Sequence, residues 1–229
     1  TGKLKSHFNH KGGSGMEYNW IKNGTILDEK AEEIYVCSQY IQIYSLEGKY
    51  KRTLKIDCFD HDMKIIDYND ESLLIYDDVV IEPGREKQTV QTPYRFVSKK
   101  DGSTLSTLNL HFPRRNSNAV ARQEENGWYP FQFYYPHNMH YGSDIMIMDL
   151  SCDTLYQLSA NKKLTPIFAR KPSVYASEPK NVWTPLLTTD KFMLFGTFIL
   201  DFNTTGKKGI EFMYDFKTGQ VKKVSIMDQ

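Results

Sequence analysis

The sequence has few of the features that mark membrane-spanning, nucleic-acid-binding or disulfide-rich proteins. Its 229 residues contain no apolar run near the ~20 residues that a membrane-spanning helix needs. The net charge is only +1, from 29 basic and 28 acidic side chains. These charges are spread along the chain, so no basic stripe indicates a nucleic-acid partner.

Cysteine is scarce as well. Cys37, Cys58 and Cys152 are too few and too widely spaced for a disulfide framework or for a paired zinc site. We therefore interpret them as small apolar groups that are buried in the fold. The number of cysteines does not indicate a cellular compartment.

Signatures of metal binding and catalysis are missing too. The acids and histidines gather in four short clusters, at 60–62, 67–71, 77–78 and 137–140. None has the spacing of an EF-hand or an obvious partner ligand elsewhere. No Gly-x-Ser-x-Gly elbow occurs, and the glycines at 12–15 lack the helix that follows a phosphate-binding loop. The sequence thus predicts no metal, no cofactor and no assignable catalytic residue.

What the sequence does have is aromatic residues and a repeated strand pattern. The 13 Phe and 15 Tyr favour half-buried strand surfaces. Residues 34–56 show the pattern: a short strand at 34–37, a second at 41–44, a turn at 46–49 and a third strand at 50–56. Apolar residues alternate in the middle segment, which predicts one face on a core and the other in water.

The same order of segments recurs along the chain. The turn centres are 46, 54, 59 and 58 residues apart, at Gly2, Gly48, Gly102, Asn161 and Gly219. Blades of β-propellers recur at roughly 40 to 50 residues, and at more where loops are inserted. Apolar segments at 25–27 and 63–66 supply a fourth strand to their units. A β-sandwich is the alternative, but its strands lack this unit-level repetition.

We therefore predict an all-β protein, a β-propeller of four-stranded antiparallel blades with about four of an expected six blades present. The chain is expected to be a single partial propeller domain over 1–229. Its units are expected at 24–56, 62–110, 118–169 and 182–226, with a lone last strand of another unit at 3–9.

Three stretches carry a family resemblance: residues 2–4 with the Gly-rich run at 9–18, residues 152–156 followed by 164–168, and residues 214–219. They resemble the six-bladed β-propeller lipoproteins of Bacteroidetes, which are distantly akin to NHL-type propellers. In that family a turn of the form Lys-Gly-x-Gly-Pro-Gly-Glu-Tyr links the blades, and the proline is missing here. The resemblance implies export to the periplasm or the outer-membrane surface, with membrane attachment only through a lipid anchor outside this chain. It supplies no catalytic residues.

The most suggestive stretch for function is aromatic. Six aromatic residues fall within the eight residues 128–135, more than one strand face can bury. Exposed rings concentrate at binding sites, whereas the alternative is a packed strand with rings in neighbouring blades. The long polar insertion at 79–93 is a second candidate binding element. The candidate ligand-binding residues are Trp128, Tyr129, Phe131, Phe133, Tyr134, Tyr135, His137 and His140.

Two functions remain open from the sequence. The first is a non-enzymatic cell-envelope module that binds or scaffolds an unidentified protein or glycan. The second is a propeller enzyme, a glycan hydrolase or lyase, in which acids and histidines meet at the ring centre. The absence of any catalytic signature favours the binding module.

Overall fold

The computed structural model describes residues 4, 6–21, 24–56, 63–78, 91–133, 138–204 and 209–225. Within these ranges the chain forms β-strands and two short 3₁₀ helices. It divides into two compact units, the first extending through His111 and the second beginning at Phe112. No helix of the described residues is long and apolar enough to cross a membrane.

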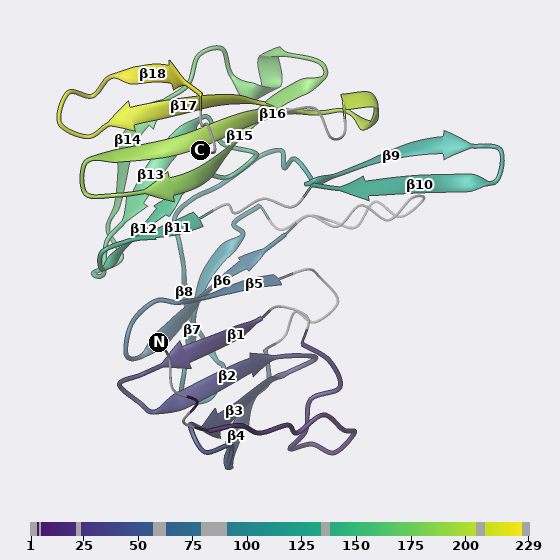
Figure 1. Cartoon of the computed structure of the whole chain (residues 1–229), viewed down its shortest axis with the longest axis vertical. Coiled ribbons are helices and arrows are strands. Elements are labelled where there is room, and N and C mark those ends of the chain that lie inside the picture. Colours follow the sequence, from purple (N-terminus) through teal and green to yellow (C-terminus); the bar gives the residue numbers. More distant parts are fainter. Residues whose placement is uncertain are drawn as a thin grey trace. The chain divides into compact units, whose positions relative to one another are not determined.

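The first unit contains two four-stranded antiparallel sheets (Figure 1). In each sheet the strands follow one another in chain order, so every connection joins neighbours. The first sheet comprises β1 (Thr25–Asp28), β2 (Glu33–Cys37), β3 (Ile41–Ser45) and β4 (Tyr50–Leu54). The second comprises β5 (Met63–Asp67), β6 (Ser72–Asp77), β7 (Tyr94–Ser98) and β8 (Thr104–Thr107).

The inner strands of the first unit are buried on both faces, which differs from the predicted core face and water face. On β3, Ile41 and Ile43 join an apolar cluster that includes Leu73 and Ile75 of β6. The opposite face of β3 carries Tyr44, which is also fully buried. The apolar alternation thus correctly predicts the strand β3, but a second layer covers the face that was expected to contact water.

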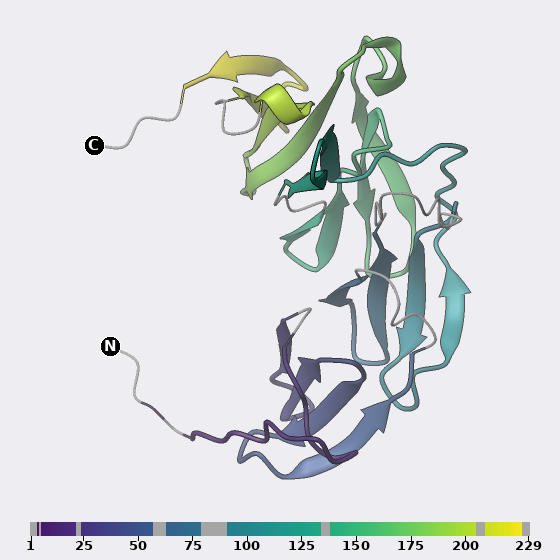
Figure 2. The ribbon, with the colours of Figure 1, turned by 90° about the vertical axis from the view of Figure 1, so that its right-hand side faces the viewer.

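The layer over Tyr44 is the N-terminal segment, which runs along the first sheet (Figure 2). The ring of His10 stacks on Tyr44 at 5.1 Å, and its Nε2 lies 2.7 Å from the carbonyl oxygen of Gly48. The hydroxyl of Tyr44 donates to the carbonyl oxygen of Met16 at 2.7 Å. The prediction of a lone strand at 3–9 is wrong for residues 4 and 6–9, which form no strand. Side-chain and ring contacts, not a strand ladder, attach this segment.

The second unit contains two further four-stranded antiparallel sheets and a separate hairpin. The hairpin consists of β9 (Ala119–Glu124) and β10 (Gly127–Gln132). The third sheet comprises β11 (Asn138–Tyr141), β12 (Asp144–Ile147), β13 (Thr154–Leu158) and β14 (Leu164–Ala169). The fourth comprises β15 (Lys180–Thr188), β16 (Phe192–Leu200), β17 (Ile210–Asp215) and β18 (Val221–Val224), and the 3₁₀ helices are η1 (Val174–Ala176) and η2 (Phe202–Thr204).

Aromatic rings fill the core between the third and fourth sheets. Phe168 of β14 lies 4.5 Å from the Tyr214 ring and 5.5 Å from the Trp183 ring, measured between centroids. Offset and edge-to-face pairs of this kind stabilise a core beyond the apolar area that they bury. The high Phe and Tyr content is thus used largely for packing in this unit.

The all-β class and the four-stranded antiparallel blades are confirmed by this topology. Of the glycines predicted at turn centres, Gly48, Gly102 and Gly219 have the left-handed backbone that these turns require, with φ of +86°, +82° and +69°. Gly2 lies outside the described residues. The number of blades in a complete ring stays a prediction. The unit expected at 118–169 contains one four-stranded sheet, β11–β14, and in addition the β9–β10 hairpin, whose strands pair only with each other. The chain also forms two compact units, where a single domain was expected.

Candidate functional site

The β9–β10 hairpin exposes large aromatic side chains. Trp128, Tyr129 and Phe131 of β10 are 50%, 44% and 40% exposed. Rings of this size are usually buried, and in the second unit most others are packed between sheets. In Figure 1 the hairpin stands outside the two four-stranded sheets of its unit.

The pairing of the two strands places these rings on both faces. Tyr129 lies opposite Arg122, and Phe131 lies opposite Val120, so these four side chains share one face. Trp128 lies opposite Gln123 and points to the other face. A ligand that lies along either face of the hairpin would therefore meet an aromatic ring.

The base of the hairpin is fixed to the fourth sheet. The ring of Phe133 lies 5.0 Å from that of Phe198 on β16, and 5.1 Å from that of Phe131. The backbone nitrogen of Phe133 donates to the carbonyl oxygen of Asn118 at 2.7 Å. The guanidinium of Arg122 lies 4.5 Å from the ring centroid of Phe202 in η2. The anchored base holds the exposed rings in place, which lowers the entropy cost of binding.

The candidate residues from the sequence fall into three groups. Trp128, Tyr129 and Phe131 are exposed on β10, and Phe133 anchors the base. His140 is exposed on β11, and thus belongs to the third sheet and not to the hairpin. The remaining candidates, Tyr134, Tyr135 and His137, lie outside the described residues, as does most of the insertion at 79–93. Ligand binding by any of these residues stays a prediction.

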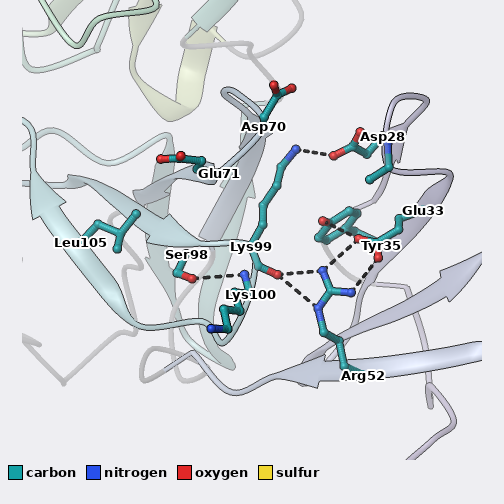
Figure 3. Close-up of a pocket in the computed structure, with 11 residues that line it drawn as sticks. Asp28, Glu33, Tyr35, Arg52, Asp70, Glu71, Ser98, Lys99, Lys100 and Leu105 are labelled. Carbon is teal, nitrogen blue, oxygen red and sulfur yellow. Dashed lines mark hydrogen bonds and ion pairs between the residues drawn. The ribbon is translucent and has the colours of Figure 1, made fainter.

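A second feature, in the first unit, is a polar cleft of about 670 Å³ between the first and second sheets (Figure 3). At its centre lies Lys99, which follows β7 and is only 7% exposed. Its Nζ donates to Asp28 at the end of β1 at 2.5 Å, and forms an ion pair with Asp67 of β5 at 2.8 Å. The buried pair with Asp28 therefore joins the second sheet to the first, while the pair with Asp67 lies within the second sheet.

Glu33 forms the second half of this network. Both of its oxygens accept from the guanidinium of Arg52, at 2.7 and 2.9 Å, and it also accepts from Lys51 and from the hydroxyl of Tyr35. Arg52 donates in addition to the carbonyl oxygen of Lys99 at 2.9 Å, as Figure 3 shows. This bidentate, multiply bonded arrangement is among the stronger forms of ion pair.

The network holds its members in their charged forms. Burial alone would raise the pKa of Glu33, but the hydrogen bonds from Arg52, Lys51 and Tyr35 outweigh it and lower that pKa to about 2. Burial would likewise raise the pKa of Asp28, and the hydrogen bonds from Lys99 and from the backbone of Ala31 lower it instead. Ionised groups that are already paired can hold two sheets together, but are poorly suited to proton transfer.

Acid should therefore destabilise the first unit. The ordinary pKa of Glu33 is 4.5 and the folded value about 2, so its contribution is complete above pH 4.5 and is lost as the pH falls towards 2. Between about pH 5 and about pH 3, we expect wild type to lose about 2 kcal/mol more unfolding free energy than Glu33→Gln. Urea denaturation at each pH measures this. The exposed control Glu29→Gln should follow wild type, and equal losses in all three proteins would contradict the assignment.

The polar cleft was missed in the sequence analysis. Asp28 and Lys99 are separated by 71 residues, and each stands near a strand end where polar residues are common. The acid clusters at 67–71 and 77–78 have no obvious partner in the sequence. In the structure Asp67 is the last residue of β5 and binds Lys99, and Asp77 ends β6 and lies 3.3 Å from Arg95. Only the pairing of distant strands reveals these partners.

The other sequence features are structural. In the Gly-rich run, the carboxylate of Glu17 accepts from the backbone nitrogen of Ser14 at 2.9 Å and closes a turn. Cys37 is buried, and burial raises the pKa of its thiol to about 12. Burial also raises that of Cys152 to about 11, while Cys58 lies outside the described residues. Among the described His, Cys, Asp and Glu residues, no group of three gathers as a metal site.

Two solved structures share a distant similarity with the chain. No protein-family model matches the chain, and no curated protein matches it. A selenomethionine-substituted virginiamycin B lyase from Staphylococcus aureus aligns with 91% of this chain and 71% of its own, at 10% identity and a TM-score of 0.40. A streptogramin B lyase aligns with 93% of this chain and 87% of its own, at 9% identity and a TM-score of 0.34. These similarities are too remote to bear on what this chain binds or does.

Proposed function

We propose that this protein is a non-enzymatic binding module of the cell envelope that binds a glycan chain on the β9–β10 hairpin. The observation that carries the proposal is the exposure of Trp128, Tyr129 and Phe131 on a hairpin whose base is anchored. Sugar rings present flat apolar faces, which stack on exposed aromatic rings. The envelope location rests on the sequence resemblance to exported lipoproteins.

The charge states of the described carboxylates favour binding over catalysis. A general acid in glycan hydrolysis needs a carboxyl group with a raised pKa. The described carboxylates with shifted pKa values are all shifted downward, towards the ionised form: Glu17, Asp28, Glu33, Glu47, Asp101 and Asp215. These groups support a scaffold that presents a binding surface.

The proposal is tested by removing one ring from each face of the hairpin. We expect the double variant Trp128→Ala/Tyr129→Ala to weaken glycan binding about 100-fold, since each exposed anchor contributes about 1.4 kcal/mol. Isothermal titration with a panel of neutral and acidic polysaccharides measures the loss. Phe131 and Phe133 are left in place so that the base of the hairpin stays packed.

The matched control removes a Trp and a Tyr of similar exposure from the first unit. Trp20 is 59% exposed and Tyr50 is 37% exposed. The double variant Trp20→Ala/Tyr50→Ala should bind every polysaccharide as wild type does. Equal losses in the two double variants would refute the hairpin as the binding surface. Release of reducing ends or unsaturated sugars by wild type would refute the non-enzymatic assignment.

A further inference from the structure

A second cavity, which we call the basal cavity, lies at the base of the hairpin within the second unit. Its volume is about 250 Å³, and Ala119 and Val120 of β9 form part of its wall. Val120 is the cross-strand partner of Phe131. The basal cavity is thus continuous with the strand pair that carries the exposed aromatic rings.

Positive charge predominates among the side chains that line the basal cavity. Three of them are cations, Arg114, Arg115 and Lys180, and one is a carboxylate, Glu178. Lys180 donates to Glu178 at 2.6 Å, but the Glu178 side chain is 73% exposed, so water and salt weaken this pair. A cavity with such an excess of cations favours an anionic occupant.

Arg114 is the cation most available to a ligand. Its guanidinium makes no ion pair with a described carboxylate, and lies 5.3 Å from the ring centroid of Tyr175. Stacking on an aromatic ring leaves the guanidinium edge and its N–H donors open to a planar or tetrahedral anion. Arginine is the side chain best suited to carboxylate and sulfate-like groups, because its donors can bind two oxygens at once.

The backbone that carries these arginines is held in position. The hydroxyl of Tyr175 donates to the carbonyl oxygen of Arg114 at 2.6 Å and to that of Ser151 at 3.1 Å. The next residues are fixed as well, because Asn116 donates through its backbone nitrogen to Ser151 Oγ and through Nδ2 to the Leu150 carbonyl oxygen, both at 2.8 Å. The cationic wall is therefore ordered before a ligand arrives, which favours binding.

From this arrangement we infer that the ligand is an acidic polysaccharide, whose carboxylate or sulfate groups enter the basal cavity while its sugar rings stack on the hairpin. The inference rests on the proposed function and makes it more specific. A neutral glycan would contact only the aromatic rings of the hairpin, and a free anion would contact only the basal cavity. A chain of linked acidic sugars would contact both the hairpin rings and the basal cavity, because sugar rings and charged groups recur along its length.

The test compares polysaccharides that differ only in charge. Full-length protein is titrated with dextran and dextran sulfate, and with polygalacturonate before and after methyl esterification. At low ionic strength the charged member of at least one pair should bind at least about tenfold more tightly, and the difference should shrink as salt screens the charges. Equal affinity within both pairs would overturn the inference.

Variants locate the charge dependence. Arg114→Gln/Lys180→Gln should weaken binding of the charged polymer by about tenfold or more and leave the neutral polymer unchanged. The control Lys217→Gln/Lys223→Gln removes the same charge from two exposed positions, one in the turn between β17 and β18 and one on β18, and should have little effect. Equal losses in the two double variants would show general attraction to a charged chain, and would overturn the basal cavity as the site.

Two further outcomes separate this inference from the function on which it rests. If inorganic sulfate alone binds as tightly as dextran sulfate does, the cavity is a site for free anions, and the inference of an acidic polysaccharide ligand is wrong. If Trp128→Ala/Tyr129→Ala leaves the binding of both polymers intact while Arg114→Gln/Lys180→Gln weakens it, the proposed hairpin function fails. If Trp128→Ala/Tyr129→Ala loses binding of both polymers and Arg114→Gln/Lys180→Gln binds both as wild type does, the proposed function stands and the inferred preference for acidic polymers is wrong.

Discussion

Replacing Lys99 by methionine should lower the free energy of unfolding of the first unit by about 3 kcal/mol, because a buried carboxylate that has lost its cationic partner is unfavourable. The Nζ of Lys99 pairs with Asp28 and Asp67, and the Asp28 side chain is only 8% exposed. Without Lys99, the Asp28 carboxylate would keep its hydrogen bond from the Ala31 backbone nitrogen but would lose the cation that pairs with it. Urea denaturation followed by circular dichroism measures the change.

An exposed ion pair provides the control for this experiment. Lys30 pairs with Asp70, and both side chains are largely exposed. Lys30→Met should change the unfolding free energy by less than about 0.5 kcal/mol. Adding Asp28→Asn to Lys99→Met should recover part of the lost unfolding free energy, because it removes the unpaired buried carboxylate. If Lys30→Met and Lys99→Met are equally destabilising, the network in the polar cleft does not hold the sheets together.

Truncating Leu73 to alanine should cost about 3 kcal/mol of unfolding free energy, through lost apolar burial and the cavity that remains. Leu73 lies on β6, is fully buried and packs with Ile41 and Ile43 of β3. The change therefore affects the cluster that joins the first and second sheets. The same denaturation assay measures it.

Leu105 serves as the control for Leu73. It lies on the outermost strand β8 and is about half exposed. Leu105→Ala should cost less than about 1 kcal/mol, because little apolar area is lost from the core. A cost as large as that of Leu73→Ala would mean that the shared apolar cluster is not the main source of stability in this unit.

The strands and their turns could be predicted from the sequence because both depend on neighbours along the chain. Apolar alternation marks Ile41–Ser45 as a strand, and Gly48 supplies the positive φ that its turn requires. The third predicted unit was wrong for the opposite reason. Residues 119–132 form two strands and a turn within that predicted unit, but these two strands pair only with each other. Which strands pair is decided by distant contacts that alternation does not encode.

The sequence by itself determined the all-β class, the four-stranded repeat and the positions of its turns, since these follow from local backbone preferences. It also singled out the aromatic stretch at 128–135. Tertiary structure alone decided that β10 exposes its rings, that Lys99 meets Asp28, and that Arg114 and Lys180 line one cavity. Exposure and charge pairing depend on which distant segments pack together, so no short window of sequence contains them.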